Sequence, residues 1–270
     1  MENPTYKQAY RVLKGEGYHV VPVGMDRYGM NVERLQASGA KIAYVMPSHQ
    51  YPTGIVMPVK RRQELLAWAY SGQDRYLIED DYDSEFRYKG KPIPALQGMD
   101  RGGRVIYMGT FSKSIAPAIR VGFMVLPEHL LEAYRERAGF YLSTVSRIDQ
   151  NILYQFITQG YYERHLNRMR ALYKGKHDAL MAGLKELEDR FLIRGEYAGL
   201  HVLLTHRQGE AEESLVARAA ELGVKVYGIS GCFIQPEEKL FDSTVMLGYA
   251  SLSEEEIRNG AKLLAKAWTF

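Results

Sequence analysis

The first half of the chain alternates short apolar runs with segments of helical spacing, and this alternation limits the folds open to it. Apolar runs lie at 18–23, 41–46, 75–79, 105–109 and 120–126, and helical patterns lie at 5–14, 31–39 and 59–70. Strands that alternate with helices build sheets whose neighbouring strands run mostly parallel. We therefore predict an α/β fold with a mostly parallel sheet.

The pattern changes from Pro127 onward. Helical stretches fill 128–190 with Gly160 as a break, and short strands, one helical pattern and a last capped helix follow at 191–195, 199–205, 211–222, 224–228, 245–250 and 251–268. This order predicts a second, α+β lobe. We place the lobe boundary within 150–165 and divide the chain into a large lobe, 1–155, and a small lobe, 156–270.

Composition excludes several classes of protein. The 270 residues are 46% hydrophobic, enough for a sizeable core. With 25% charged residues, a net charge of +3 and no dense Lys/Arg block, the chain gives no electrostatic reason to expect nucleic-acid binding. Cys232 is the only cysteine, which excludes an internal disulfide and favours a cytoplasmic setting. No apolar run approaches the ~18 residues of a membrane helix, so we expect no membrane partner.

Three successive apolar runs end in unusual polar sequences. PSHQYPTG follows at 47–54, DDYDSE at 80–85 and TFSKS at 110–114. In an open α/β sheet, ligands bind beyond the carboxyl ends of the strands. We therefore expect these three loops to build one site.

Lys113 lies between two serines, and Arg120 follows seven residues later. A lysine amine near another cation loses its proton more easily and can attack a carbonyl group to form a Schiff base. Arg120 can be that cation or can bind a phosphate, to which Thr110 and Ser112 can donate hydrogen bonds. An isolated loop lysine is more often an ordinary surface residue, but the surrounding pattern favours a covalent site.

Asp80 directly follows an apolar strand, and a buried carboxylate requires a partner. A protonated pyridine nitrogen is one suitable partner, and the hydroxyl of Tyr82 can reach a neighbouring phenolic oxygen. Two alternatives stay open for this segment. DDYDSE can be a helix N-cap with solvated acids, or Asp80, Asp81 and Asp83 can hold Mg²⁺, although the chain has no GxxxxGK[ST] loop.

Two other side chains allow two interpretations each. His49 can line a ligand pocket or be an ordinary hydrogen-bonded loop histidine. Tyr6 can stack on a planar ligand or belong to the core. The PTG at 52–54 is a turn in either case.

Taken together, these motifs resemble fold type I, pyridoxal-phosphate-dependent aminotransferases. That family has an NPTG-like turn, a strand-end Asp with a nearby Tyr, and SxSK followed by Arg, which match YPTG (51–54), EDDYD (79–83) and TFSKSIAPAIRVG (110–122). The resemblance implies that pyridoxal 5'-phosphate is the cofactor and that the sheet belongs to a partial large lobe.

The resemblance also implies a role for each residue. Lys113 carries the internal aldimine, Asp80 faces the pyridine nitrogen and Tyr82 faces the phenolic oxygen. Thr110, Ser112 and Arg120 line the phosphate, and Tyr6 stacks on the ring. His49 and Tyr51 line the effector pocket. No metal site is implied.

The wording of the motifs is similar to one branch, the MocR/GabR transcription regulators. PSHQYPTGIVMPVKRRQELLAWA, YLIEDDYDSEFRY, IPALQ and VIYMGTFSKSIAPAIR carry this similarity, which is dense from 40 to 127. Such regulators join a winged helix-turn-helix domain to an aminotransferase-like domain that binds pyridoxal phosphate and senses an effector. By resemblance, the chain is a homodimer-forming piece of a longer regulator, and DNA binding belongs to a domain that this chain lacks.

Four departures from the family patterns bear on function. Tyr51 replaces the aminotransferase turn asparagine, and Met246 stands where a late strand carries the substrate arginine. The GABA-sensing members have an arginine in a loop that matches 228–233, which has none here, and a second arginine at the position of Gln8. We predict a sensor that binds an amine or amino-acid-like effector as an external aldimine, with little or no turnover. The alternatives are an ordinary aminotransferase and a Mg²⁺-dependent phosphotransferase.

Overall fold

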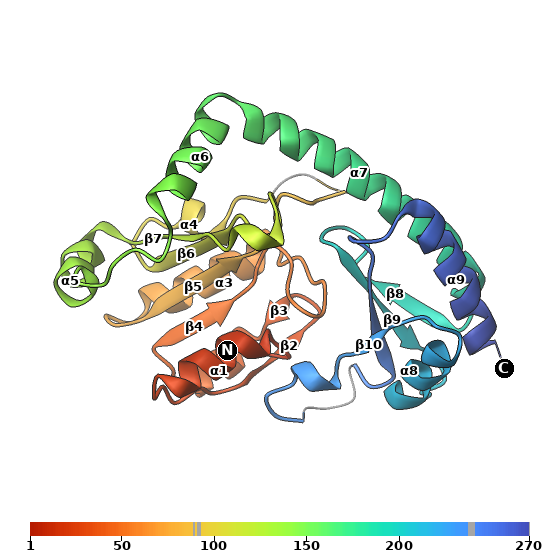
Figure 1. The fold of residues 1–270 in the computed structure, drawn as a ribbon. Coiled ribbons are helices and arrows are strands. Elements are labelled where there is room, and N and C mark those ends of the chain that lie inside the picture. Colours follow the sequence, from red (N-terminus) through yellow and green to blue (C-terminus); the bar gives the residue numbers. More distant parts are fainter. Residues whose placement is uncertain (89, 91–92, 237–240, 270) are drawn as a thin grey trace.

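The computed structural model describes residues 1–88, 90, 93–236 and 241–269. A four-stranded sheet of order β4-β5-β6-β7 forms the centre of the first lobe (Figure 1). Its strands are β4 (Ile42–Val45), β5 (Tyr76–Asp81), β6 (Val105–Thr110) and β7 (Gly122–Val125). The first three are parallel and β7 is antiparallel to β6, so the mostly parallel sheet is confirmed.

Smaller elements surround this sheet. They are β1 (Glu2–Asn3), α1 (Lys7–Gly15), β2 (Val23–Asp26), β3 (Gly29–Met30), α2 (Val32–Ala37), α3 (Val59–Tyr70), α4 (Leu96–Met99) and the 3-10 helix η1 (Pro117–Ile119). The strand predicted at 18–23 is wrong except for its last residue, since β2 begins at Val23, which pairs with Glu2. Pro22 has no N–H to donate and cannot extend the ladder backward.

Arg62 on α3 holds the loop that follows β4. This side chain is buried, and its Nε, Nη1 and Nη2 donate to the carbonyl oxygens of Met57, Pro94 and Pro47 at 3.1, 2.9 and 2.8 Å. Buried guanidinium groups need such partners because burial removes their water. The loop that contains 47–57 is therefore fixed to α3 by a buried cation.

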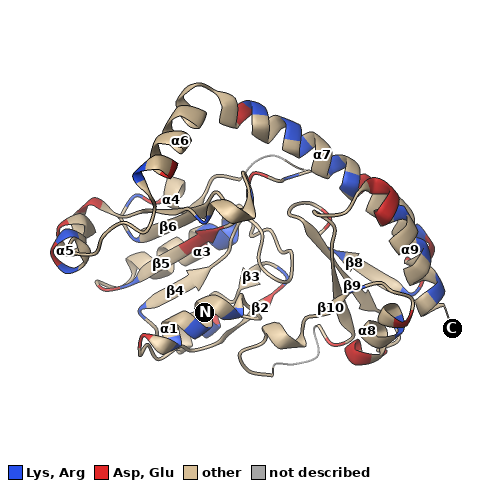
Figure 2. Ribbon diagram, in the orientation of Figure 1, with Lys and Arg blue, Asp and Glu red and all other residues tan. Residues whose placement is uncertain are grey.

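Helices connect this sheet to a second one. They are α5 (Glu128–Ala138), α6 (Arg147–Thr158) and α7 (Tyr161–Leu184), and charged residues line α7 (Figure 2). Gly160 lies just before α7 with φ of 72°, a conformation that favours glycine. It separates α6 from α7, in agreement with the predicted helix break. The division at residue 155 remains a prediction.

The C-terminal lobe is built on an antiparallel sheet of order β10-β11-β9-β8. Its elements are η2 (Lys185–Leu187), β8 (Phe191–Arg194), β9 (His201–His206), α8 (Glu212–Glu221), β10 (Tyr227–Gly228), η3 (Ser230–Cys232), β11 (Thr244–Gly248) and α9 (Glu254–Trp268). The predicted capping box of Ser253 and Glu256 begins α9. This lobe is therefore α+β, as the sequence predicts.

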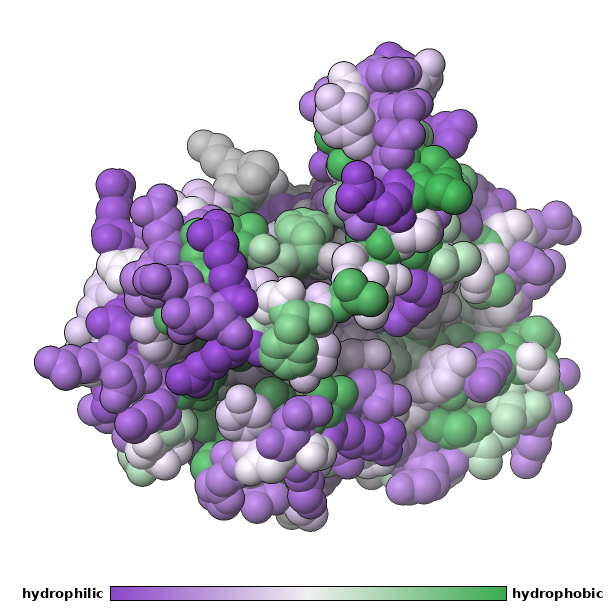
Figure 3. All heavy atoms as spheres, turned by 60° about the vertical axis from the view of Figure 1, so that its left-hand side comes forward, coloured by the Kyte–Doolittle hydropathy of each residue, from purple (hydrophilic) through white to green (hydrophobic). Residues whose placement is uncertain are grey.

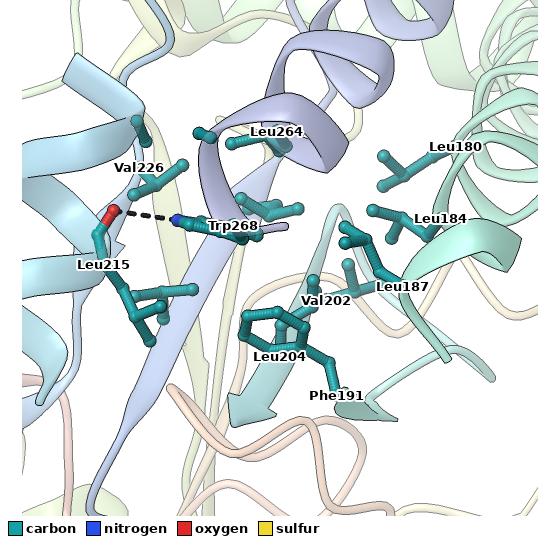
Figure 4. Packing of buried hydrophobic residues seen from close by; sticks show 14 of the residues in the cluster. Leu180, Leu184, Leu187, Phe191, Val202, Leu204, Leu215, Val226, Leu264 and Trp268 are labelled. Atoms are coloured by element: carbon teal, nitrogen blue, oxygen red, sulfur yellow. Dashed lines mark hydrogen bonds between the residues drawn. The ribbon is translucent and has the colours of Figure 1, made fainter. Parts of the chain in front are cut away.

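Trp268 lies at the centre of the C-terminal core. Its ring is fully buried among leucine, valine and phenylalanine side chains of α7, α8, α9 and the sheet (Figure 4). Its Nε1 donates to the carbonyl oxygen of Leu215 at 3.0 Å, so the indole buries no unpaired polar group. This one side chain joins α8 to α9.

Apolar side chains also reach the surface on the side of α5, α6 and β7. Figure 3 turns this side forward and shows apolar atoms among hydrophilic ones. They include Phe123, Met124, Val125, Phe140, Tyr141, Leu142, Ile148, Ile152 and Tyr154. Apolar surface of this extent is typical of a contact area. Within the described residues, no helix has both the length and the apolar composition to span a bilayer.

The two lobes meet closely around Gly199. Its N–H donates to Phe86 O at 2.7 Å, and its carbonyl oxygen accepts from the hydroxyls of Tyr88 and Tyr249, each at 2.8 Å. A Cβ on Gly199 would lie 1.9 Å from Cε1 of His49. The close approach of the His49 ring therefore requires glycine at this position.

We predict that Gly199→Ala lowers the free energy of unfolding by about 3 kcal/mol, because it adds a clash to a strained backbone. Gly199 has φ of 76°. Gly209 is the matched control, because its φ is 78° and no heavy atom lies within 4 Å of a Cβ there. Gly209→Ala should cost only about 1 kcal/mol. Urea unfolding measures both, and equal losses would contradict the packing argument.

His201 on β9 also crosses between the lobes. Its Nε2 donates to Pro52 O at 3.0 Å. The pKa of His201 is lowered from 6.5 to about 3, mainly by burial and also by the neighbouring His49 and Lys113, against the opposing effect of the Pro52 bond. The imidazole is therefore neutral in the folded protein at pH 5, whereas in the unfolded chain it is protonated there.

This difference predicts a pH dependence of stability. Unfolding takes up a proton at His201 below about pH 6.5, so this group lowers the free energy of unfolding by about 2 kcal/mol between pH 7 and pH 5. In cofactor-free His201→Gln, the loss of stability between these pH values should be smaller by that amount. His19→Gln, which changes an exposed histidine, is the control. An unchanged pH dependence in His201→Gln would show that His201 is not the group responsible.

Candidate functional site

The parallel pairing of β4, β5 and β6 sets the geometry of the site. Val45 pairs with Glu79, and Asp80 pairs with Met108. Because the strands run in the same direction, their carboxyl ends lie at one edge of the sheet. The three polar loops therefore begin side by side at that edge.

Asp80 lies on one face of β5 and is largely removed from water. Tyr44 of β4 donates its hydroxyl to Asp80 Oδ2. Burial raises the pKa of Asp80, the Tyr44 bond opposes this effect, and the charges of Asp81 and Asp83 raise it further. A carboxylate in this setting is stabilised by a cationic partner.

The other acids of DDYDSE have separate partners. Asp81 lies on the opposite face of β5, where Tyr107 Oη donates to Oδ2 at 2.8 Å and Ser84 N donates to Oδ1 at 3.2 Å. Asp83 lies 2.9 Å from His49 Nδ1. Among the described residues, no three or more His, Cys, Asp or Glu side chains are grouped to hold a metal ion. The Mg²⁺ alternative therefore gains no support from the three aspartates.

The helix N-cap alternative for this segment is wrong. β5 runs through Asp81, and turns and bends follow it up to Phe86 without a helix. The acids accept hydrogen bonds from side chains and from one turn N–H, so no helix end needs them.

The loop after β6 brings hydroxyl groups and the Arg120 backbone together. Thr110 Oγ1 accepts from Ser112 N at 3.1 Å and donates to Val121 O at 3.2 Å. The loop begins after Thr110 and ends before Gly122, and these two residues pair with each other. The backbone of Arg120, two residues before Gly122, therefore lies close to the start of the loop. Lys113 and Arg120 are both exposed, so their charged ends are free to meet a ligand.

Arg120 has an unusual backbone conformation. It is left-handed, with φ of 50° and ψ of 34°, at the end of η1. Non-glycine residues adopt this conformation at a cost of about 1–2 kcal/mol. Strain of this kind is concentrated at functional sites, where the surrounding structure maintains it. The strained turn joins η1 to β7 beside Thr110.

A buried cluster lies behind the Asp80 side chain. Tyr82 Oη lies 3.0 Å from His49 Nδ1, and the rings of His49 and His201 are 4.9 Å apart. His49 is 1% exposed and Asp83 is 3% exposed. Burial raises the pKa of Tyr82 well above its usual value, and Asp83 and Asp80 raise it further. Tyr82 is therefore a neutral hydroxyl.

Tyr6 and Tyr51 form the aromatic side of the site. Their rings meet edge to face with centroids 5.9 Å apart, and Tyr6 is 46% exposed. Burial first, and then Cys232, raise the pKa of Tyr51 to about 12. Tyr6 therefore presents an exposed ring next to Tyr51.

Sequence reasoning missed several participants. Tyr44 can be found from the pleat, because Tyr44 pairs with Ile78 and thus shares a face with Asp80 two residues on. His201, the partner role of Asp83 and the approach of Cys232 to Tyr51 have no sequence signal, since they depend on how the chain folds back on itself.

Comparison with known proteins agrees with this geometry. A model of the family "Aminotransferase class I and II" matches residues 1–264. The HTH-type transcriptional regulator YdeL of Bacillus subtilis is 41% identical over 99% of this chain and 57% of its own length. The probable rhizopine catabolism regulatory protein MocR of Rhizobium meliloti is 34% identical over 99% of this chain and 54% of its own.

A solved structure extends the comparison to the fold. LysN, the α-aminoadipate aminotransferase of Thermus thermophilus, complexed with N-(5'-phosphopyridoxyl)-L-leucine, has a TM-score of 0.85 and 27% identity over 99% of this chain and 70% of that chain. The predicted fold type I architecture, in partial form, is thus confirmed. The chain spans a little over half the length of the regulators that it matches. It belongs to the aminotransferase class I and II family, and over nearly its whole length it is similar to part of the MocR-type transcriptional regulators.

Proposed function

We propose that this chain binds pyridoxal 5'-phosphate and senses an amine or amino-acid-like effector for a GntR/MocR-type regulator. The observation that carries the proposal is the shared edge of the sheet, where Asp80 lies one residue before the end of β5 and β6 leads into the Lys113 loop. The similarity to LysN, whose structure contains a phosphopyridoxyl group, supports the choice of cofactor.

The side chains at this edge fit that cofactor in chemical type. Asp80 is a half-buried carboxylate that favours a cationic partner, as a protonated pyridine nitrogen would be. Tyr82 is a neutral hydroxyl for the phenolic oxygen. The phosphate would be held by Arg120 together with Thr110 and Ser112, whose hydroxyls lie 3.1 Å apart. The exposed ring of Tyr6 provides a stacking surface.

Lys113 is the amine that would hold the cofactor. When bound, pyridoxal phosphate supplies an aldehyde carbon that condenses with a primary amine, with loss of water, and a ring that withdraws electrons. Lys113 Nζ would be the resident amine, and the primary amine of an effector would compete with it for the same carbon. The charge of Lys113 lowers the pKa of His201, which supports a position of this amine near the buried cluster.

The absence of an anchoring arginine favours a sensor over an enzyme. By resemblance, aminotransferases carry the substrate arginine at the position of Met246. Met246 lies in β11 and pairs with Leu203 of β9 and Tyr227 of β10. The second candidate function is an ordinary aminotransferase, and the similarity to LysN favours it. DNA contact would fall to a domain outside this chain.

We also propose that the chain acts as a homodimer. The apolar side chains that reach the surface at Phe140, Tyr141, Leu142 and along α6 support a contact with a second copy. Leu142 is an apolar residue and is 92% exposed. A subunit contact would bury this side chain.

The covalent role of Lys113 can be tested by reduction. Pyridoxal phosphate followed by borohydride should add one cofactor mass to Lys113, and Lys113→Ala should lose this adduct and the absorption band of the lysine-bound cofactor. Lys41→Ala is the matched control, since Lys41 is an exposed lysine paired with Asp74 at the start of β4. An adduct that persists in Lys113→Ala would contradict the proposal.

The same protein separates sensor from enzyme. Addition of primary amines and amino acids should displace the Lys113 band without accumulation of keto acid beyond one equivalent. Keto acid formed over many turnovers would instead support the aminotransferase alternative.

Arg120→Asn should separate stability from cofactor binding. Asparagine tolerates the left-handed conformation better than arginine, so the cofactor-free free energy of unfolding should stay equal or rise by up to about 1 kcal/mol. The affinity for pyridoxal phosphate should fall at least about tenfold, because a charged hydrogen-bond donor to the phosphate is lost. Arg101→Asn, an exposed arginine in the turn before β6, is the control. An unchanged affinity in Arg120→Asn would exclude Arg120 from the phosphate site.

A further inference from the structure

One ring nitrogen in the buried cluster has two polar neighbours. His49 Nδ1 lies 2.9 Å from Asp83 Oδ2 and 3.0 Å from Tyr82 Oη. A ring nitrogen of a neutral histidine is either a donor or an acceptor, never both. The two neighbours therefore compete to decide the role of this nitrogen.

Asp83 decides the role because an ionised carboxylate only accepts hydrogen bonds. If Nδ1 carried a lone pair, this lone pair would face the lone pairs of Oδ2 at 2.9 Å in a buried setting, which is repulsive. With the proton on Nδ1, the same distance is an ordinary charge-assisted hydrogen bond. Asp83 therefore selects the Nδ1–H tautomer of His49.

The other nitrogen agrees with this assignment. His49 Nε2 is buried and has no hydrogen-bond partner among the described residues. It faces two glycines, since a Cβ on Gly54 would lie 3.5 Å from Nε2 and a Cβ on Gly199 would lie 2.7 Å from it. A buried N–H without an acceptor would be costly, so a bare Nε2 is the better fit to this apolar contact.

Tyr82 is then left with a free proton. Since Nδ1–H has no lone pair, Tyr82 Oη can only accept at His49, and its own O–H points elsewhere. The His49 ring cannot move away, because Gly199 lies against it on the far side. The dyad of His49 and Asp83 thus holds the Tyr82 oxygen in place without using its proton.

We propose that His49 and Asp83 are positioning residues that keep the Tyr82 hydroxyl proton directed at the phenolic oxygen of the cofactor. This inference rests on the proposed cofactor site. Asp83→Asn tests it, because the new side-chain NH₂ can donate to His49 Nδ1. Nδ1 then becomes an acceptor that is able to take the Tyr82 proton away from the cofactor.

The readout is the pH midpoint of the absorption change of the lysine-bound cofactor, measured on the full chain. Loss of the Tyr82 hydrogen bond leaves the phenolic oxygen more basic, so the midpoint should rise by about one pH unit in Tyr82→Phe. Asp83→Asn should rise by a similar amount. The double variant should show no further rise, because both changes remove the same hydrogen bond.

Asp81→Asn is the matched control, since it is an equally small change at a buried carboxylate of the same segment, bonded to Tyr107 on the other face of β5. Like Asp83→Asn it removes a charge near Asp80, but it does not touch His49, so its midpoint should not rise. A midpoint of Asp83→Asn equal to that of the unaltered protein, or additive shifts in the double variant, would overturn the inference. Failure of the proposed function differs visibly, because the unaltered protein would then show no lysine-bound band at all.

A second measurement reads the tautomer in the unaltered protein. In the unaltered, cofactor-loaded protein labelled with ¹⁵N-histidine, the His49 resonance should show a protonated Nδ1 and a bare Nε2. His49→Asn identifies the resonance by its loss. A protonated Nε2 with a bare Nδ1 would overturn the inference directly.

Discussion

The parallel pairing of β4, β5 and β6 is the constraint on which the rest of the molecule depends. It brings three loops to one edge of the sheet, although more than 20 residues separate each loop from the next in the sequence. It also alternates the acids of β5 between two environments. Glu79 points to the α3 side, where Leu96 N and Gln97 N donate to it at 2.9 Å and Arg62 lies 3.8 Å away. Asp80 points to the opposite face and is left with Tyr44. One strand thus carries, in adjacent positions, an acid that is bonded within the fold and the acid that we propose faces the ligand.

Partnering explains why these two acids differ. Burial raises the pKa of both carboxyl groups, but in Glu79 two backbone donors and the nearby Arg62 oppose this effect. Asp80 has one neutral donor and two acidic neighbours, so its environment opposes the charge. A fold retains such a poorly compensated carboxylate where a ligand supplies the missing cation. The same contrast applies to Lys113, which is exposed beside the strained Arg120 instead of being paired in the core.

Sequence reasoning worked where the signal is local. Strand and helix periodicity predicted the sheet. The motif spacing predicted that the loop with Asp80 and the loop with Lys113, which leads to Arg120, begin at neighbouring strand ends. It failed at residues 18–22, where Pro22 interrupts an apolar run. At DDYDSE it left a helix N-cap open as an alternative, and the structure has side-chain partners there instead. His201 could not be predicted because its contact with Pro52 joins residues 149 positions apart. Such contacts depend on how the lobes dock, and no local pattern encodes that.

Contacts between the lobes also connect the proposed sensor site to the arrangement of the lobes. Tyr82 directly follows β5 and contacts His49, whose ring leaves no room for a side chain at Gly199. The Gly199 carbonyl in turn accepts from Tyr88 of the first lobe and Tyr249 of the second. Packed interiors transmit displacement because they contain few voids. A ligand that changes what Tyr82 must bind therefore acts on the same residues that hold the lobes together, and it can favour one lobe arrangement only by the difference in its affinity for the two.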